Sequence, residues 1–208
     1  MRGRDKNIDF SLSALDIDEV INEVWTDSDL IKEEVLGNKD GFMANIKKVY
    51  PSHTKIEDVL VKVTILNSFY STVIYDVYSM AEHIVQVKDI DKRIEAGDLS
   101  VVNDISHVTL AGTDYNFYSF ATKYCSLHNP EKFPIYDSYV EDVLIYLKNT
   151  KKLESANFKK QEDLKDIGKF KNLLCEILEK DFGHQSDLTL KKLDMYLWAL
   201  GKKYFPKY

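Results

Sequence analysis

The stretch from Ile56 to Val87 reads IEDVLVKVTILNSFYSTVIYDVYSMAEHIVQV, and its apolar residues recur at steps of three and four. This spacing is the period of an α-helix that buries one face. Only eight glycines and four prolines interrupt the chain, and similar spacing continues along most of its length. The pattern therefore predicts an all-α protein. The apolar stripe consists of Val59, Val63, Leu66, Tyr70, Ile74, Val77, Ala81 and Ile84.

Polar pairs at 67–68 and 71–72 are expected to break this stretch into two helices. The same reasoning places a loop at 128–134, because prolines at 130 and 134 cannot continue a helix interior. Residues 1–208 are expected to form a single compact domain of about ten helices. The other predicted helices span residues 16–25, 28–36, 40–49, 89–96, 98–105, 114–127, 138–147, 161–181 and 189–203.

Composition and length place the chain among ordinary globular proteins. Its 208 residues are 44% hydrophobic and 30% charged. A chain of this length and composition can bury a stable hydrophobic core without disulfide bonds. Cys125 and Cys175 lie far apart in sequence and show no CxxC spacing, which is typical of a reducing compartment. Neither a signal segment nor an apolar run long enough to span a bilayer is found. A soluble, cytoplasmic protein without membrane contact is expected.

The net charge is −6 and the isoelectric point is near 5.4. These values argue against a protein that coats nucleic acid non-specifically, because such binding depends on neutralising phosphates. The charge is nevertheless uneven along the chain. Acidic residues dominate 9–34, whereas lysines gather at 151–171 and 191–207, so a basic C-terminal side can coexist with an acidic remainder.

Several common chemistries lack their motifs. The five histidines show no HExxH or HxxxH spacing, so no metal site is expected and each histidine is interpreted as a surface or satisfied core residue. The chain also contains no Walker loop, no GxGxxG and no GxSxG. Nucleotide hydrolysis, dinucleotide chemistry and the common serine hydrolase arrangement are therefore unsupported, and no cofactor is expected.

One acidic residue stands out by its position. Asp137 follows the proline-containing loop in the stretch Phe133-Pro134-Ile135-Tyr136-Asp137-Ser138-Tyr139-Val140 and comes just before a predicted helix. Ser138 and Glu141 have the spacing of a capping box at the start of that helix. Position alone favours a structural role, because an aspartate near a helix N-terminus is stabilised by free backbone amides.

The segment Pro134–Leu144 resembles the part of helix-hairpin-helix DNA glycosylases, the endonuclease III and adenine glycosylase superfamily, that carries the catalytic aspartate. Two further stretches match in the right order. Residues 66–72 resemble the early helix-turn of that family, and residues 110–114 stand where its Leu-Pro-Gly-x-Gly hairpin is expected. The resemblance covers roughly residues 57–147.

The resemblance implies two helical lobes with a degenerate helix-hairpin-helix motif. It also implies a monofunctional DNA glycosylase that flips a modified or damaged base out of the duplex and excises it, with Asp137 as the catalytic acid. DNA is the implied partner. The implied substrate-binding residues are Asn67, Phe69, Tyr70, Tyr136 and Tyr139, and the implied DNA-binding residues are Gly112, Thr113, Lys123 and His128.

The chain departs from the family at three places. Asp114 stands where bifunctional members carry a Schiff-base lysine, so lyase chemistry is not expected unless the alignment is shifted or Lys123, nine residues later, takes that role. The C-terminal cluster of four cysteines is absent, so no iron–sulfur cluster is expected. The hairpin keeps one glycine, Gly112, and lacks the proline, which weakens its fit to a DNA phosphate.

Two alternatives remain open from the sequence. The first is a non-catalytic DNA-binding or protein-interaction module with the same helical fold. The second is an unrelated helical protein, such as a regulator or a phage-defence component, in which Asp137 only begins a helix.

Overall fold

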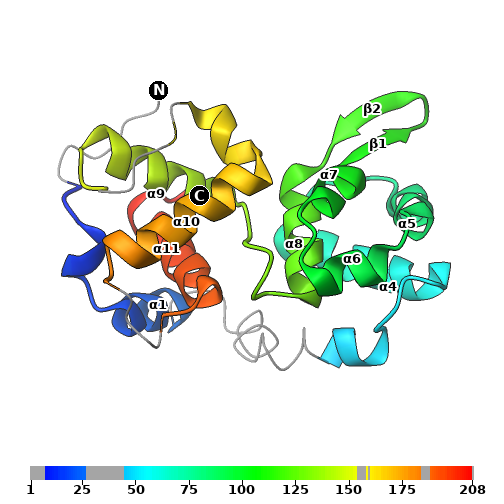
Figure 1. The fold of residues 1–208 in the computed structure, drawn as a ribbon, viewed down its shortest axis with the longest axis horizontal. Coiled ribbons are helices and arrows are strands. Elements are labelled where there is room, and N and C mark those ends of the chain that lie inside the picture. Colours follow the sequence, from blue (N-terminus) through cyan, green and yellow to red (C-terminus); the bar gives the residue numbers. More distant parts are fainter. Residues whose placement is uncertain (1–7, 27–44, 154–157, 159, 184–187, 208) are drawn as a thin grey trace. The chain divides into compact units, whose positions relative to one another are not determined.

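The computed structural model describes residues 8–26, 45–153, 158, 160–183 and 188–207. It is mostly helical, as the hydrophobic spacing predicts, with one small two-stranded sheet among the described residues (Figure 1). The chain divides into two units. The central unit comprises residues 38–135, and the terminal unit comprises 1–37 together with 136–208.

The terminal unit joins the two ends of the chain around one helix. Helix α11 contacts α1, α9 and α10. Its inner face is fully buried because Leu193, Leu197 and Leu200 recur at steps of three and four. The described elements of this unit are the 3₁₀ helix η1 (Leu12–Ala14), α1 (Ile17–Thr26), α9 (Ser138–Asn149), the 3₁₀ helix η2 (Gln161–Lys165), α10 (Ile167–Lys180) and α11 (Leu190–Tyr204).

Gly201 allows α9 and α11 to approach closely. A Cβ atom at this position would lie 2.5 Å from the Tyr139 Cβ and 2.7 Å from the Tyr139 carbonyl oxygen. No real side chain accepts contacts this short, so only glycine fits here without moving one helix away from the other.

The central unit packs its helices around α8. Helix α8 contacts α4, α6 and α7, and α4 also lies against α5. Residues 45–49 are helical as well. The described elements are α4 (Ile56–Tyr70), α5 (Val77–Gln86), α6 (Ile90–Ala96), α7 (Ser100–Ser106), β1 (His107–Leu110), β2 (Thr113–Asn116) and α8 (Tyr118–His128).

The stripe that predicted the fold forms part of the core of the central unit. Val59, Val63, Ala81 and Ile84 are fully buried. The break between the two helices lies at 71–76, the later of the two positions expected from the sequence.

The helix predicted at 114–127 is wrong at its N-terminal end. Residues 107–116 form an antiparallel β-hairpin in which Leu110 pairs with Thr113, and α8 begins only at Tyr118. Ala111 and Gly112 both have positive φ, as a two-residue type I′ hairpin turn requires. The residues expected to form the hairpin of a helix-hairpin-helix motif are therefore the turn between two strands.

The predicted capping box at the start of α9 is also wrong. Asp137 is the N-cap and accepts the Tyr139 backbone N–H at 3.0 Å, so Ser138 is already the first helical residue. Glu141 instead accepts hydrogen bonds from the Tyr136 hydroxyl and the Gln161 amide. Burial is the main reason that the pKa of Glu141 is raised.

Most other helix predictions hold to within about two residues. The segment predicted as one helix at 161–181 is divided, because Asp166 ends η2 and caps α10 by accepting the Lys169 N–H. The predicted helix 28–36 and the start of the helix predicted at 40–49 lie outside the described residues. Within the described ranges, no helix has both the length and the apolar character needed to cross a bilayer.

Candidate functional site

Asp137 lies at the N-terminus of α9, two residues after the boundary between the units. Its side chain is half-buried, and Oδ1 accepts the Tyr139 amide. The bond from the Tyr139 amide orients the carboxylate at the start of the helix. The arrangement can fix a negative charge at a defined place, which both a helix cap and a catalytic carboxylate require.

Tyr136, expected to bind substrate, is a core residue of the terminal unit. Only 7% of it is exposed, its ring packs edge-on against Phe170, and its hydroxyl donates to Glu141. The bond to Glu141 ties the Tyr136 side chain to the first turn of α9. The structure therefore does not bring this aromatic ring to the surface.

Tyr139, the second expected aromatic beside Asp137, is half-buried and lies in a cluster of rings and lysines. Its ring meets Trp198 edge to face at 6.4 Å between centroids. The ammonium groups of Lys202 and Lys207 lie 5.1 and 4.8 Å from the Tyr139 ring centroid. We call Tyr139, Trp198, Lys202 and Lys207 the aromatic–lysine cluster.

Asn67, expected to bind substrate, holds a loop of the central unit. Its Oδ1 accepts the Thr72 hydroxyl and the Ile74 N–H, and its Nδ2 donates to the Ile74 carbonyl, each at 2.9 Å. Val73, between these two partners, has φ 59°, a conformation unusual for a β-branched residue. The amide of Asn67 thus stabilises a strained turn after α4.

Lys123 and Tyr70, both predicted site residues, meet in the central unit. The Lys123 ammonium donates to the Ser119 hydroxyl at 2.6 Å and lies 5.5 Å from the Tyr70 ring centroid. Lys123 is only 3% exposed, so the structure does not present this predicted DNA-binding residue at the surface. Phe69, the neighbour of Tyr70, is half-buried.

Gly112 and Thr113, expected to bind DNA, are exposed at the tip of the β-hairpin. Gly112 belongs to the two-residue turn, and Thr113 is the first residue of β2. The predicted DNA-binding residues of the central unit therefore do not share one surface, because Lys123 and His128 are buried whereas the turn is open.

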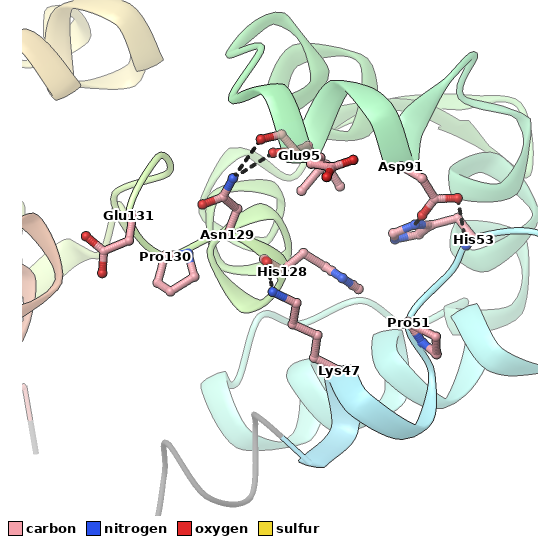
Figure 2. A pocket seen from close by; sticks show the side chains of 10 residues that line it. Lys47, Pro51, His53, Asp91, Glu95, His128, Asn129, Pro130 and Glu131 are labelled. Atoms are coloured by element: carbon pink, nitrogen blue, oxygen red, sulfur yellow. Dashed lines mark hydrogen bonds and ion pairs between the residues drawn. The ribbon is translucent and has the colours of Figure 1, made fainter.

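A pocket of about 500 Å³ in the central unit contains residues that the sequence did not single out together (Figure 2). His53 donates through Nδ1 to Asp91 at 2.6 Å, and Asp91 also accepts the His53 backbone N–H. Burial, followed by the charge of Lys62, lowers the pKa of His53 to about 4. These two partners lie 38 residues apart, so no local motif could have revealed their pairing.

His128, expected to contact DNA, lines the same pocket. It is the last residue of α8 and is only 6% exposed, and its ring centroid lies 4.6 Å from that of His53. Burial, followed by the charge of Lys62, lowers its pKa to about 2. The prediction that the loop begins at His128 is therefore wrong, because α8 extends one residue further than predicted.

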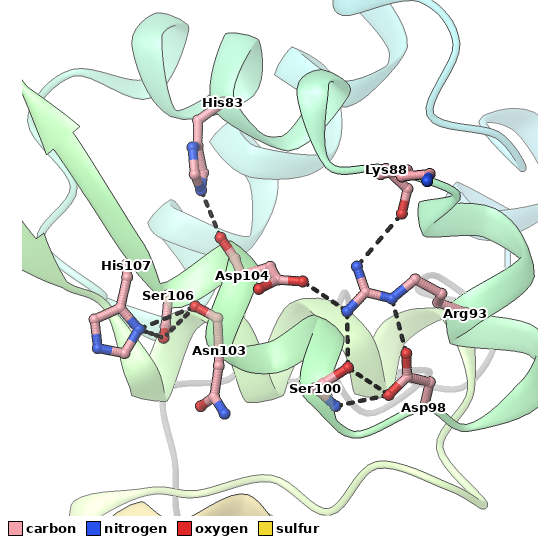
Figure 3. A network of polar contacts seen from close by, with 9 residues as sticks. All are labelled: His83, Lys88, Arg93, Asp98, Ser100, Asn103, Asp104, Ser106 and His107. Carbon is pink, nitrogen blue, oxygen red and sulfur yellow. Dashed lines mark hydrogen bonds and ion pairs between the residues drawn. The ribbon is translucent and has the colours of Figure 1, made fainter.

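A second polar cluster joins α6 to α7 (Figure 3). Arg93 donates through Nε to Asp98 at 2.8 Å and through Nη2 to Ser100 and Asp104 at 2.8 and 2.6 Å. Hydrogen bonds from Ser100 and then from Arg93 lower the pKa of Asp98 to about 2. The groups are paired with one another across a tight helix connection, so we assign this cluster a structural role.

Comparison with known proteins places the chain in a family. The family model described as HI_0787_N, an N-terminal domain, matches residues 13–132, which is more than half of the chain. An uncharacterized protein of Haemophilus influenzae is 42% identical over 187 residues, covering 89% of this chain and 87% of that protein. No solved structure matches. His53, Asp91 and His128 lie within the matched segment, and Asp137 follows it. The chain therefore belongs to the HI_0787_N family.

Proposed function

We propose that this protein is a monofunctional DNA glycosylase, or a diverged relative of one, in which Asp137 is the catalytic carboxylate. The observation that carries the proposal is the fixed, half-buried carboxylate at the N-terminus of α9. Asp137 lies within the stretch that resembles the catalytic segment of the helix-hairpin-helix glycosylases.

The chemistry of base excision suits such a group. Breaking the bond between a base and its sugar builds positive charge on the sugar ring, and a nearby carboxylate stabilises that charge or activates the attacking water. The hydrogen bond from the Tyr139 amide holds the carboxylate in one orientation before the substrate arrives. Preorganised negative charge of this kind contributes most when it need not be rearranged during the reaction.

The aromatic–lysine cluster supports a nucleic-acid substrate. Aromatic faces stack on bases and lysines neutralise phosphates, and this unit presents both beside the start of α9. Lys207 also pairs with Asp142 of α9 at 2.8 Å, which ties the C-terminal lysines to the helix that begins at Asp137. An overall charge of −6 does not oppose a local site of this type.

The division of the chain is consistent with the same proposal. A glycosylase of this class requires two helical lobes, and the chain divides into two units between Ile135 and Tyr136. Asp137 is therefore carried on the first turn after that division.

The test is base release from duplex and single-stranded oligonucleotides that carry a panel of modified bases. Alkali converts each abasic site to a strand break, which is then counted on a gel. Asp137→Asn preserves the helix cap, because asparagine caps as well as aspartate, and replaces the carboxylate with a neutral amide. Asp166→Asn is the matched control, since Asp166 caps α10 through the same type of bond. We expect release by the wild type and by Asp166→Asn, and its loss in Asp137→Asn.

A second candidate is a non-catalytic DNA-binding module. The β-hairpin favours it, because residues 113–116 are exposed strand where the resemblance implies a hairpin between helices. DNA binding that is unaffected by Asp137→Asn, with no base release from any substrate in the panel, would favour this candidate over the enzyme.

A further inference from the structure

Residues 45–55 are attached to the rest of the central unit through one buried histidine. The structure describes every residue of this segment, and only His53 is buried, with 3% of it exposed. Val49, an apolar side chain of the same segment, is 64% exposed. A segment is usually held to a core by burying apolar side chains, because this removes hydrocarbon surface from water. Here an ionisable ring occupies that place.

The ring of His53 contacts two helices of the central unit (Figure 2). Its Nδ1 and its backbone N–H bond to Asp91 of α6 at 2.6 and 3.3 Å. Its centroid lies 4.6 Å from that of the His128 ring and 5.5 Å from that of the Tyr124 ring, both in α8. The attachment of the segment to α6 and α8 therefore depends on the state of this one side chain.

Two lysines place positive charge beside the imidazoles. Lys47 of the segment donates to the His128 carbonyl, and the fully buried Lys62 of α4 donates to the Ser52 carbonyl at 2.9 Å. The charge of Lys62 opposes protonation of both imidazoles, and that of Lys47 opposes protonation of His128. The bonds that complete the attachment thus also favour neutral rings.

An added proton on His53 would have no acceptor in the attached state. Because Nδ1 already donates to Asp91, a second proton on this ring must bind Nε2. Among the described residues, Nε2 of His53 is one of the buried polar atoms without a hydrogen-bond partner. A buried donor without an acceptor destabilises the state that contains it, so the attached segment requires a neutral ring.

We propose that residues 45–55 form an acid-sensitive latch, in which protonation of His53 releases the segment while α4, α6 and α8 stay folded. In the released state the ring meets water and binds a proton as it does in an unfolded chain. Lys47, Pro51 and His53 line the pocket of about 500 Å³, so release removes part of the pocket wall. The latch does not rest on the glycosylase proposal.

The pH at which the latch opens follows from the two states of His53. Its pKa is about 4 when attached, mainly because of burial, and is about 6.5 for a free histidine. The equilibrium constant for release therefore rises as the pH falls below 6.5, by about twentyfold between pH 7 and pH 5. Burial lowers the pKa of Lys62 only to about 8, so this lysine stays protonated over that range. The other charged or titratable groups around the latch are Lys47, Asp58, Asp91, Glu95, Tyr124, His128 and Glu131.

Hydrogen exchange of the full chain, followed by NMR at pH 7 and pH 5, measures the release. The reporters are the amide of His53, bonded to Asp91, and the amide of Tyr50, bonded to the Ile46 carbonyl. After correction for intrinsic exchange rates, we expect their protection to fall by at least about twentyfold at pH 5. It should depend little on dilute urea, because release exposes little surface.

The buried amide of Ala121 in α8 reports unfolding of the whole unit. It should be better protected than the latch at both pH values and should lose protection as urea is added. This difference separates release of the segment from global unfolding.

Variants connect the pH dependence to His53. His53→Gln keeps a polar side chain but cannot be protonated, so protection of the Tyr50 amide should lose about twentyfold of its pH dependence. His107→Gln alters an exposed histidine of β1 and should keep the wild-type dependence. The proposal is wrong if protection in 45–55 is the same at pH 7 and pH 5, if it falls only together with that of Ala121, or if His53→Gln retains the wild-type dependence. Should His53→Gln fail to fold, the pH and urea series of the wild type decide the question.

Discussion

The buried imidazoles of His53 and His128 make the stability of the protein depend on pH. In the folded state their pKa values are lowered to about 4 and about 2, whereas an unfolded chain binds protons near pH 6.5. Below pH 6.5 the unfolded state therefore holds more protons, and the folded state loses stability as the pH falls. The charge of Lys62 opposes protonation of both rings and that of Lys47 opposes protonation of His128, whereas Asp91 favours protonation of His53.

We expect the free energy of unfolding to fall by about 2 kcal/mol per imidazole between pH 7 and pH 5. Urea unfolding at several pH values measures this directly. In His53→Gln the fall should be smaller by about the same amount. His107→Gln should retain the wild-type slope, because His107 is exposed. Equal slopes in the wild type and in His53→Gln would contradict the burial of a neutral ring.

Asn67 has a structural role that can be separated from substrate binding. Replacing it with alanine leaves the buried Ile74 N–H without its partner and frees the loop around Val73. We expect Asn67→Ala to destabilise the protein by about 1–3 kcal/mol in urea unfolding. Asn149→Ala, at the exposed end of α9, should change stability by less than about 0.5 kcal/mol. A variant that keeps full stability but loses DNA binding would instead assign Asn67 to the substrate.

At the residue scale, the sequence predicted the position of Asp137 but not the surroundings of the histidines. Asp137 lies beside a proline loop and a helix start, and both features are local. The pairing of His53 with Asp91 and the burial of Lys123 depend on contacts between separate helices. Neither can be obtained from spacing along the chain.

At the scale of elements, the contact between α9 and α11 sets the geometry at Asp137. Tyr139, whose amide orients Asp137, is also the residue that Gly201 touches. We expect Gly201→Ala to destabilise the protein by about 1–3 kcal/mol, because the new methyl group would overlap Tyr139 backbone and force the helices apart.

Gly168 offers a matched control within α10. A Cβ atom there would meet only the Asp166 Oδ1, at 3.3 Å. Gly168→Ala is therefore expected to change stability by less than about 1 kcal/mol, because the gain in helix propensity offsets the small shift that the Asp166 oxygen must make. Equal effects of the two substitutions in thermal unfolding would show that the α9–α11 contact does not require glycine.

The elements that the sequence predicted well are the long amphipathic helices. Helix α4 has one buried face whose residues repeat at the helix period, and of the two breaks expected after it, at 67–68 and 71–72, only the later one ends the helix. The β-hairpin at 107–116 was missed because its strands are four residues long and only β1 alternates, with Val108 and Leu110 buried. The pair Ala111-Gly112 was the only sequence signal for a two-residue hairpin turn. It was weak because the first position of such a turn needs a positive φ, which alanine rarely adopts.

At the scale of the whole molecule, the sequence predicted a mostly helical fold, and the described residues confirm it. The sequence did not predict which segments form each unit, because the terminal unit combines residues from both ends of the chain. Such an assembly depends on pairing over long sequence separations, for example the Tyr196 hydroxyl donating to the Leu12 carbonyl. Periodicity within a helix does not specify its partner.

The central claim is that Asp137 acts on a nucleic-acid substrate through its charge rather than only as a helix cap. The most direct measurement is the single-turnover rate of base release by Asp137→Asn and by Asp166→Asn on the best substrate of the panel. We expect Asp137→Asn to be slower than the wild type by at least about a hundredfold, with unchanged unfolding temperature, and Asp166→Asn to retain the wild-type rate. Equal rates in the two variants, or no release by the wild type from any substrate, would contradict the claim.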